Sequence, residues 1–439
     1  MAASPHPPLK PPHYAATPGL VRRTRGDLPP EALEARAYRT LLTAPLLGAR
    51  PEEPTLVSTA QGAIRRMLLT VPDYAIGSEP LTDVYRSLLR ELSPTVALVV
   101  LTHESVEGDV RDLLAAAGRA DDTVVVAPDH LVFSVWAEDG YVVVTDAGGR
   151  TFFVEPYSFP RFGDGLIAEF VSNATDLGKA QAPLYFQGGN VLIGDDFFLI
   201  GADYPANSLQ YIGNVLLPNP GESRSELIRR LYGEYLDTGR RLVYVGSTIP
   251  VPAEARRRFE LDGQPWTESV HVGNAPGTAQ PIFHIDMFIT LAGRGANGAY
   301  RVLVGDPAMA AELTGEPVRA QAMREAFDSI AAGLARLEFE VIRNPLPLVY
   351  VDDPDRRERS WYFATANNAL VETAGAGGQP HVYLPTYAYG DWASLAPVEA
   401  RNAEIWEGLG FTVHRLGDCH PLASALGSVH CIKKFLARG

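Results

Sequence analysis

The sequence predicts an α/β protein whose main part is one large domain. Apolar strands alternate with helices along most of the chain, and several strands are apolar throughout, as in sheets covered on both faces. A unit of two strands, a helix and a further strand recurs about five times, without a strict sequence repeat. No long glycine-, serine- or charge-rich linker interrupts residues 54–439, which favours one domain with internal pseudosymmetry over several independent domains.

Residues 1–53 are expected to form a proline- and alanine-rich N-terminal arm, with a short helix from Leu28 to Leu42. Within residues 54–439, apolar periodicity predicts helices over 81–92, 106–117, 222–235, 308–313, 318–337 and 397–409. Apolar runs predict strands over 67–71, 96–101, 123–126, 141–144, 190–193, 197–200, 241–246, 283–291, 301–305, 339–342, 348–351, 361–364, 369–372, 382–385, 411–416 and 429–433. The stretches 150–182 and 248–281 show little regular pattern, so we expect long loops that wall a substrate or close over it.

Composition excludes several classes of protein. Apolar residues make up 46% of the chain and charged residues 21%, which is typical of a soluble globular protein. There is no run of eighteen apolar residues to form a membrane span, and the proline-rich start lacks the pattern of a signal peptide. Two cysteines without a Cys-x-x-Cys pair predict neither a disulfide framework nor a zinc ribbon. These features together predict a cytoplasmic protein.

Net charge and histidine spacing limit the kinds of molecule and metal ion that the protein is expected to bind. The net charge of −14 argues against nucleic acid and favours cationic partners. Ten histidines occur without His-x-x-x-His or His-Glu-x-x-His spacing, so no metal site is predicted.

Cys431 is the first candidate for chemistry. It follows the small residues Gly427 and Ser428 and precedes a short apolar step, as a residue does at a strand end. A thiol in such a turn can act as a nucleophile if a neighbouring group takes its proton. The alternative is a buried structural cysteine, which is the commoner role for a lone cysteine.

Two further segments combine polar residues with glycine. Trp136-Ala137-Glu138-Asp139-Gly140 places acids after an aromatic residue, at a turn between two apolar strands. Phe186-Gln187-Gly188-Gly189-Asn190 places two amides around two glycines, just before a strand. The alternatives are an ordinary Asp-Gly turn and the start of a hairpin.

His284 and Asp286 lie in an apolar stretch that predicts a strand. Alternation along a strand would place both side chains on one face, about 7 Å apart. Polar groups on a buried face are costly unless they are paired or used, although a lone His284 would more often be a satisfied core residue. Together with Cys431 and Asp139, the pair would supply a nucleophile, an acid/base and two carboxylates for a cationic substrate.

These segments, in order and spacing over roughly residues 55–437, resemble the guanidino-group-modifying superfamily of pentein fold, which includes agmatine, arginine and peptidyl-arginine deiminases. The family motif Trp-x-(Arg/Gln)-Asp corresponds to Trp136–Asp139, Glu-Gly-Gly-(Asn/Asp) to Gln187–Asn190, Gly-His-x-Asp to Phe283–Asp286, and Gly-Gly-x-x-His-Cys to Gly427–Cys431. The segment Asn367–Glu372 resembles the family's asparagine-bearing strand. The resemblance implies a five-bladed, pseudosymmetric α/β-propeller of ββαβ units.

The resemblance also implies a mechanism without metal or organic cofactor. Asp139 and Asp286 would hold the substrate guanidinium, Cys431 would attack its carbon, and His284 would act as acid and then as base. The further substrate-binding residues that it implies are Trp136, Glu138, Gln187, Asn190 and Asn368. The partner would be a cationic guanidine, free or within a peptide; a homo-oligomer is left open.

Three departures from the family pattern concern the substrate. Gln187 replaces a glutamate, so it can hydrogen-bond His284 without adding negative charge. Glu138 replaces the usual arginine or glutamine, and Phe283 replaces glycine. An additional acid at Glu138 would suit a second cationic group, so we expect a divergent deiminase. Amidino transfer, arginine dihydrolysis and a catalytically silent guanidinium- or protein-binding role remain the alternatives.

Three remaining candidates are given lesser roles. His430 would point away from Cys431 in an extended segment and is expected to be structural or to support a catalytic residue. Cys419 is expected to be a free thiol on a surface loop. The glycine-rich stretch 293–298 lies between strands and not at a helix start, so we do not assign it to phosphate.

Overall fold

The computed structural model describes residues 50–212, 218–253, 255–270, 277–315 and 321–439. The short helix predicted over 28–42 lies outside these residues. The chain forms two compact units, which are described separately. Unit 1 contains Ser78–Glu91 and Val245–His430, and unit 2 contains residues 50–77, Leu92–Tyr244 and Cys431–Gly439.

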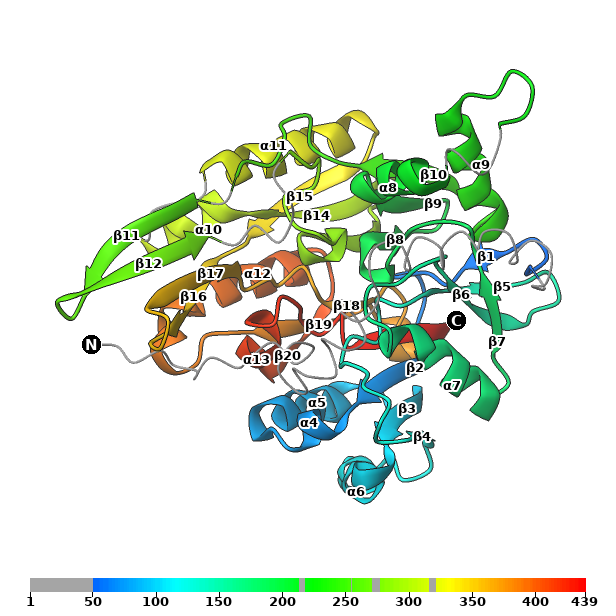
Figure 1. Cartoon of the computed structure of the whole chain (residues 1–439), viewed down its shortest axis with the longest axis horizontal. Coiled ribbons are helices and arrows are strands. Elements are labelled where there is room, and N and C mark those ends of the chain that lie inside the picture. The colour runs from blue at the N-terminus through cyan, green and yellow to red at the C-terminus, as the bar shows by residue number, and fades with distance from the viewer. Residues whose placement is uncertain (1–49, 213–217, 254, 271–276, 316–320) are drawn as a thin grey trace. The chain divides into compact units, whose positions relative to one another are not determined.

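Unit 2 contains three sheets with a common pattern of strands and helices (Figure 1). In the first sheet, β5 (Val142–Thr145) and β6 (Thr151–Glu155) are antiparallel, helix α7 (Ile167–Ala174) follows, and β7 (Gly178–Gln181) lies parallel to β6; β1 (Thr55–Leu56) adds to β5. The second contains antiparallel β8 (Val191–Ile193) and β9 (Phe197–Gly201), then α8 (Asp203–Ile212), α9 (Arg224–Tyr235) and β10 (Arg241–Val245), which pairs with β9.

The third sheet of unit 2 joins the C-terminal strand to the first long strand. β21 (Lys433–Arg438) is antiparallel to β2 (Ile64–Val71), and β3 (Ala97–His103) and β4 (Thr123–Ala127) continue the sheet in parallel. Between β2 and β3 the chain forms α4 (Asp73–Ile76) and α5 (Glu79–Glu91), and α6 (Glu107–Ala116) lies between β3 and β4.

Unit 1 repeats the pattern twice and adds one further sheet. β13 (Ile289–Arg294) and β14 (Tyr300–Asp306) precede α10 (Pro307–Thr314), α11 (Gln321–Arg336) and β15 (Glu340–Pro345). β18 (Leu370–Glu372) and β19 (His381–Thr386) precede α12 (Ala396–Gly408) and β20 (Thr412–Asp418), which α5 contacts; the short α13 (His420–Ala423) follows. The added sheet has the order β11 (Ala255–Leu261), β12 (Gln264–Val270), β17 (Glu358–Phe363) and β16 (Leu348–Asp353).

Local sequence explains where these elements begin and why they are buried. Asp306 caps α10 by accepting hydrogen bonds from the backbone of Ala308 and Met309, and Pro307 occupies the first turn, where a missing N–H costs nothing. Every residue of β8 and β9 is buried, which confirms the prediction of strands covered on both faces. The mixed α/β class predicted from the sequence is confirmed.

The strand predicted over 283–291 is wrong in its first half. Residues Ile285–Met287 form a single 3-10 turn, closed by Phe288 N–H donating to Ile285 O at 3.1 Å, and β13 begins only at Ile289. The apolar side chains of this segment are buried in the turn, and a short apolar run does not distinguish a turn from a strand. The expected strand alternation of His284 and Asp286 therefore does not apply.

The two predicted long loops are also corrected. Residues 150–182 contain β6, α7 and β7, and residues 248–281 contain the antiparallel hairpin of β11 and β12, visible in Figure 1. Asp262 and Gly263 at its tip both have positive φ, 55° and 68°, as a two-residue hairpin turn of the primed type requires. The Asp-Gly signal was present, but the charged residues of β11 hid the strand.

Candidate active site

The site residues predicted from the sequence divide between the two units. His284, Asp286 and Asn368 belong to unit 1, and the others belong to unit 2: Trp136, Glu138, Asp139, Gln187, Asn190 and Cys431. Each of these side chains is at most 8% exposed. Burial of so many polar groups is costly without internal partners, so the partners within each unit show how the side chains are held.

In unit 2 the backbone brings three predicted motifs together. Cys431 lies in a turn immediately before β21, and its carbonyl oxygen accepts a hydrogen bond from Glu138 N–H at 3.1 Å. Gly188 N–H donates to Asp139 O at 3.1 Å. A Cβ on Gly188 would lie 1.9 Å from Glu138 O, so this close approach requires glycine. Gly188, which follows Gln187, therefore allows close packing against the Asp139 turn.

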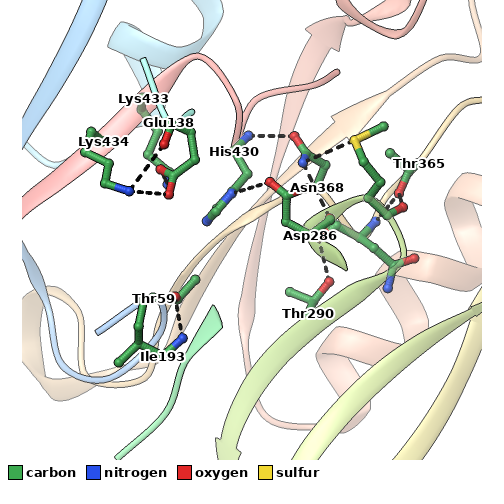
Figure 2. A network of polar contacts seen from close by, with 12 residues as sticks. Thr59, Glu138, Ile193, Asp286, Thr290, Thr365, Asn368, His430, Lys433 and Lys434 are labelled. Atoms are coloured by element: carbon green, nitrogen blue, oxygen red, sulfur yellow. Dashed lines mark hydrogen bonds and ion pairs between the residues drawn. The ribbon is translucent and has the colours of Figure 1, made fainter. Parts of the chain in front are cut away.

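Glu138 has two cationic partners, Lys433 and Lys434 (Figure 2). Each lysine Nζ lies 2.7 Å from a different carboxylate oxygen of Glu138. The side chains of Glu138, Lys433 and Lys434 are 5%, 0% and 6% exposed, and together they carry one net positive charge. Glu138, for which the sequence predicted a substrate contact, forms an internal ion pair with both lysines. The sequence signal for this ion pair was the combination of an acid at 138, where the family has arginine or glutamine, with two lysines shortly after Cys431.

Asp139 is paired with Arg161, a residue that the sequence reasoning missed. Arg161 Nη2 donates to Asp139 Oδ2 at 2.7 Å, and Arg161 Nε donates to Asp164 Oδ2. Burial alone would lower the pKa of Arg161, but the charges of Asp164 and Asp139 outweigh it and raise the pKa above its ordinary value. Arg161 lies within the stretch expected to be an unstructured loop, and no local pattern indicated its partners.

Gln187 and Trp136 are held by neighbouring polar groups. Gln187 Nε2 donates to Tyr185 Oη at 3.3 Å, and Asn190 N–H donates to Gln187 O at 3.0 Å within a short 3-10 turn. The backbone N–H of Trp136 donates to Ser134 Oγ at 3.2 Å. Tyr185 and Ser134 are thus additional polar residues beside predicted ones.

In unit 1, Asp286 forms a network with His430 and Asn368 (Figure 2). His430 Nδ1 lies 2.8 Å from Asp286 Oδ2, and since a carboxylate only accepts, this nitrogen carries the proton. His430 N–H donates to Asn368 Oδ1 at 2.9 Å, and Asn368 Nδ2 donates to Asp286 O at 3.4 Å. The residue that precedes the candidate nucleophile is therefore fixed to a predicted substrate carboxylate.

His284 stands at the start of the 3-10 turn that carries Asp286. Its ring is 1% exposed and lies 4.5 Å from the Phe283 ring, measured between centroids. Thr365, 78 positions further along the chain, donates from Oγ1 to Met287 O at 2.7 Å and so holds the turn in place. This tie keeps His284 and Asp286 on a defined turn instead of a strand.

The prediction that Cys419 is a surface thiol is wrong. It is fully buried, and its Sγ donates to Gly417 O at 3.2 Å. Burial raises the pKa of this thiol above its ordinary value, which opposes a nucleophilic role. The stretch 293–298 covers the end of β13 and most of the turn that leads to β14, so it does not lie at a helix start.

Two kinds of feature are absent from the described residues. Within these ranges, no group of three or more histidine, cysteine or acidic side chains is placed to bind a metal ion. No helix of the described chain combines the length and the apolarity that crossing a membrane requires.

Comparison with known proteins places the fold. No family model and no curated protein match the sequence. Among solved structures, the agmatine deiminase of Enterococcus faecalis is 14% identical, with a TM-score of 0.56 over 90% of this chain and 99% of that one. A structural-genomics protein assigned as an agmatine deiminase is 12% identical, with a TM-score of 0.56 over 87% and 95% of the two chains.

A dimethylarginine dimethylaminohydrolase from Pseudomonas aeruginosa matches more weakly, with 13% identity and a TM-score of 0.35 over 85% of this chain and 99% of that one. The chain therefore has the mixed α/β fold of the two agmatine deiminase structures, and the resemblance that its motifs predict is confirmed at the level of the fold.

Proposed function

We propose that this protein is a deiminase, a hydrolase that converts a guanidino group to a ureido group and ammonia. The observation that carries the proposal is the agmatine deiminase fold over 87–90% of the chain, combined with the four motif residues of such an enzyme. These residues are Cys431 as nucleophile, His284 as acid and base, and the carboxylates Asp139 and Asp286. We also propose that the sheets of repeated pattern are the five blades of a propeller.

In the proposed reaction, Asp139 and Asp286 hold the guanidinium so that its carbon faces the thiolate of Cys431. Attack forms a C–S bond, and the C–N bond breaks as His284 gives a proton to the departing ammonia. His284 then takes a proton from water, whose oxygen attacks the thiouronium carbon. The C–S bond breaks, the thiolate is restored, and the ureido product leaves.

Several contacts support these roles without fixing the substrate. The hydrogen bond between Glu138 N–H and Cys431 O ties the Asp139 turn to the nucleophile's backbone, and the His430–Asp286 contact holds a second carboxylate. We propose an arginine within a peptide, or an arginine-like metabolite, as the substrate. Transfer of the amidino group to an amine, or loss of both nitrogens, would use the same four residues.

A specific observation favours a second candidate, a catalytically silent protein that binds a guanidinium or a protein partner. Both carboxylates proposed to hold the substrate already have internal nitrogen partners, Arg161 for Asp139 and His430 for Asp286. Gln187 in place of the family's glutamate also removes a negative charge. This candidate predicts binding without turnover.

The test is a measurement of ammonia and ureido product over a panel of guanidines: agmatine, arginine, methylated arginines and arginine peptides. We expect turnover of at least one compound, with loss of at least a thousandfold in Cys431→Ala, because removal of a nucleophile removes the covalent route. Cys419→Ala is the matched control and should keep the activity. Ammonia release that persists in Cys431→Ala would remove this residue from the mechanism, and binding without turnover would favour the silent protein.

A further inference from the structure

Arg161 is held more firmly than an ordinary surface arginine. Its guanidinium contacts two carboxylates, Asp139 and Asp164, and lies over the ring of Phe159 at 5.0 Å from the centroid. Its side chain is 19% exposed, whereas those of Asp139 and Asp164 are 8% and 2% exposed. Charge-assisted contacts of this kind are stronger when they are shielded from water.

Asp164 is a fixed anchor for this arginine. It accepts hydrogen bonds from the backbone N–H and the hydroxyl of Ser134, both at 2.6 Å. The backbone before it packs so closely that a Cβ on Gly163 would lie 1.6 Å from Val132 O. The loop that carries Arg161 is therefore seated on the segment that leads to Trp136 and Asp139, and it directs the guanidinium at Asp139.

We infer that Arg161 is an internal competitor for the substrate guanidinium at Asp139, and that it sets the affinity of this protein for guanidines. The inference rests on the proposed role of Asp139 in holding the substrate. A carboxylate that binds a guanidinium through two parallel hydrogen bonds uses both of its oxygens. In Asp139, Oδ2 already accepts a hydrogen bond from the guanidinium of Arg161. A substrate must take this oxygen from Arg161.

Asp164 makes the exchange feasible. When a substrate takes Asp139, Arg161 keeps an anionic partner because its Nε is already on Asp164. The displaced cation is not left buried and unpaired, which would be far more costly. Because an arginine remains charged at all ordinary pH values, Arg161 does not open the contact by losing its proton. The apparent affinity for a guanidine is then the intrinsic affinity reduced by the fraction of molecules in which Arg161 has left Asp139.

The variant Arg161→Met tests this directly, because methionine keeps a long side chain beside Phe159 and removes the cation. Calorimetric titration with agmatine should give about tenfold tighter binding than in the unaltered protein, as expected if Asp139 is open in about a tenth of molecules. Adding Asp139→Asn to Arg161→Met should abolish the gain. Arg161→Lys, which cannot form the forked contact, should give a smaller gain and covers the case in which the methionine variant does not fold.

Arg240→Met is the matched control. Arg240 belongs to the same unit, pairs with Asp237 at 2.6 Å and is 15% exposed, so its loss reports the general effect of removing a mostly buried, paired arginine. It should leave agmatine binding unchanged. Equal or weaker binding in the Arg161 variants, absence of binding included, would overturn the inference. Weaker binding would make Arg161 a positioning residue for Asp139.

Turnover in the same variants separates the inference from the proposed function. A lower KM with kcat within about twofold would support both, since only a ground-state competitor has been removed. Tighter, Asp139-dependent binding without any Cys431-dependent turnover would retain the competitor and reject the deiminase. Turnover of a guanidine with a raised KM in Arg161→Met would retain the deiminase and reject the competitor.

Discussion

The two cysteines differ in their surroundings at the scale of single residues. Cys431 precedes a strand, and its backbone is tied to the Asp139 turn through Glu138. Cys419 donates its S–H to Gly417 O in a fully buried position. A cysteine with no exposed surface and a satisfied S–H has a structural role, although its place in a predicted loop suggested an exposed thiol.

We therefore expect Cys419 to resist alkylation by iodoacetamide in the folded protein at pH 8. The raised pKa of this thiol keeps it protonated at pH values where an ordinary cysteine is partly ionised, and burial blocks the reagent. Mass spectrometry of the digested protein checks this, with labelling in denaturant as the control. Labelling of Cys419 before unfolding would show that its segment opens readily.

Single residues also show which parts of the site could be predicted. The motifs indicated Cys431, His284, Asp139 and Asp286 because catalytic residue types occupy short, ordered segments. The ion-pair partners of Glu138 were missed because they are set by the fold, since Glu138 and Lys434 are 296 positions apart. Arg161 is closer to Asp139 in sequence, yet only the packing of its loop makes it a partner.

At the scale of elements, the start of β21 is fixed by a buried ion triad. Lys433 and Lys434 are the first two residues of the strand, and Glu138 lies between them (Figure 2). Lys433 Nζ also lies 3.9 Å from the centroid of the Phe435 ring. One carboxylate with two oxygens holds both lysines and thereby fixes the start of the strand.

Replacement of Glu138 by glutamine should lower the free energy of unfolding by about 3–5 kcal/mol, because two buried lysines lose their compensating charge. Urea denaturation monitored by circular dichroism measures the change. The double variant Glu138→Gln with Lys434→Met should recover part of the loss, since one of the two cations is removed. A loss below about 1 kcal/mol would mean that water reaches the triad and that the strand start is held by the backbone alone.

The correctly predicted elements are determined by local sequence pattern, whereas the missed ones depend on contacts with distant residues or lack an apolar pattern. Apolar runs and helical spacing located most strands and helices, because burial on both faces leaves a continuous pattern. The turn at Ile285–Met287 is held by Thr365 from a distant segment, so its sequence alone looked like the start of β13. The β11–β12 hairpin contains three consecutive arginines, Arg256–Arg258, which no apolar pattern would assign to a strand.

At the scale of the whole molecule, each unit is assembled from separate parts of the chain. Unit 2 contains Cys431–Gly439 as well as residues 50–77 and 92–244. β21 pairs with β2 more than 360 positions away, with Met67 opposite Phe435. Such non-local pairing costs chain entropy before its contacts form. The third sheet of unit 2 is therefore completed only when β21 pairs with β2.

Removal of residues 433–439 should therefore loosen one sheet selectively. The truncated chain keeps Cys431 but lacks β21, so the amides of β2 that donate to it lose their partners and Phe435 and Leu436 no longer cover the sheet. We expect much faster hydrogen exchange in β2 than in the full chain, whereas β14 in unit 1 should keep its protection because the truncation leaves its partner strands, β13 and β15, in place. Equal loss of protection in β2 and β14 would show that the two units unfold as one cooperative body. Unchanged protection in β2 would mean that pairing with β3 and burial by the remaining core hold the strand without its C-terminal partner.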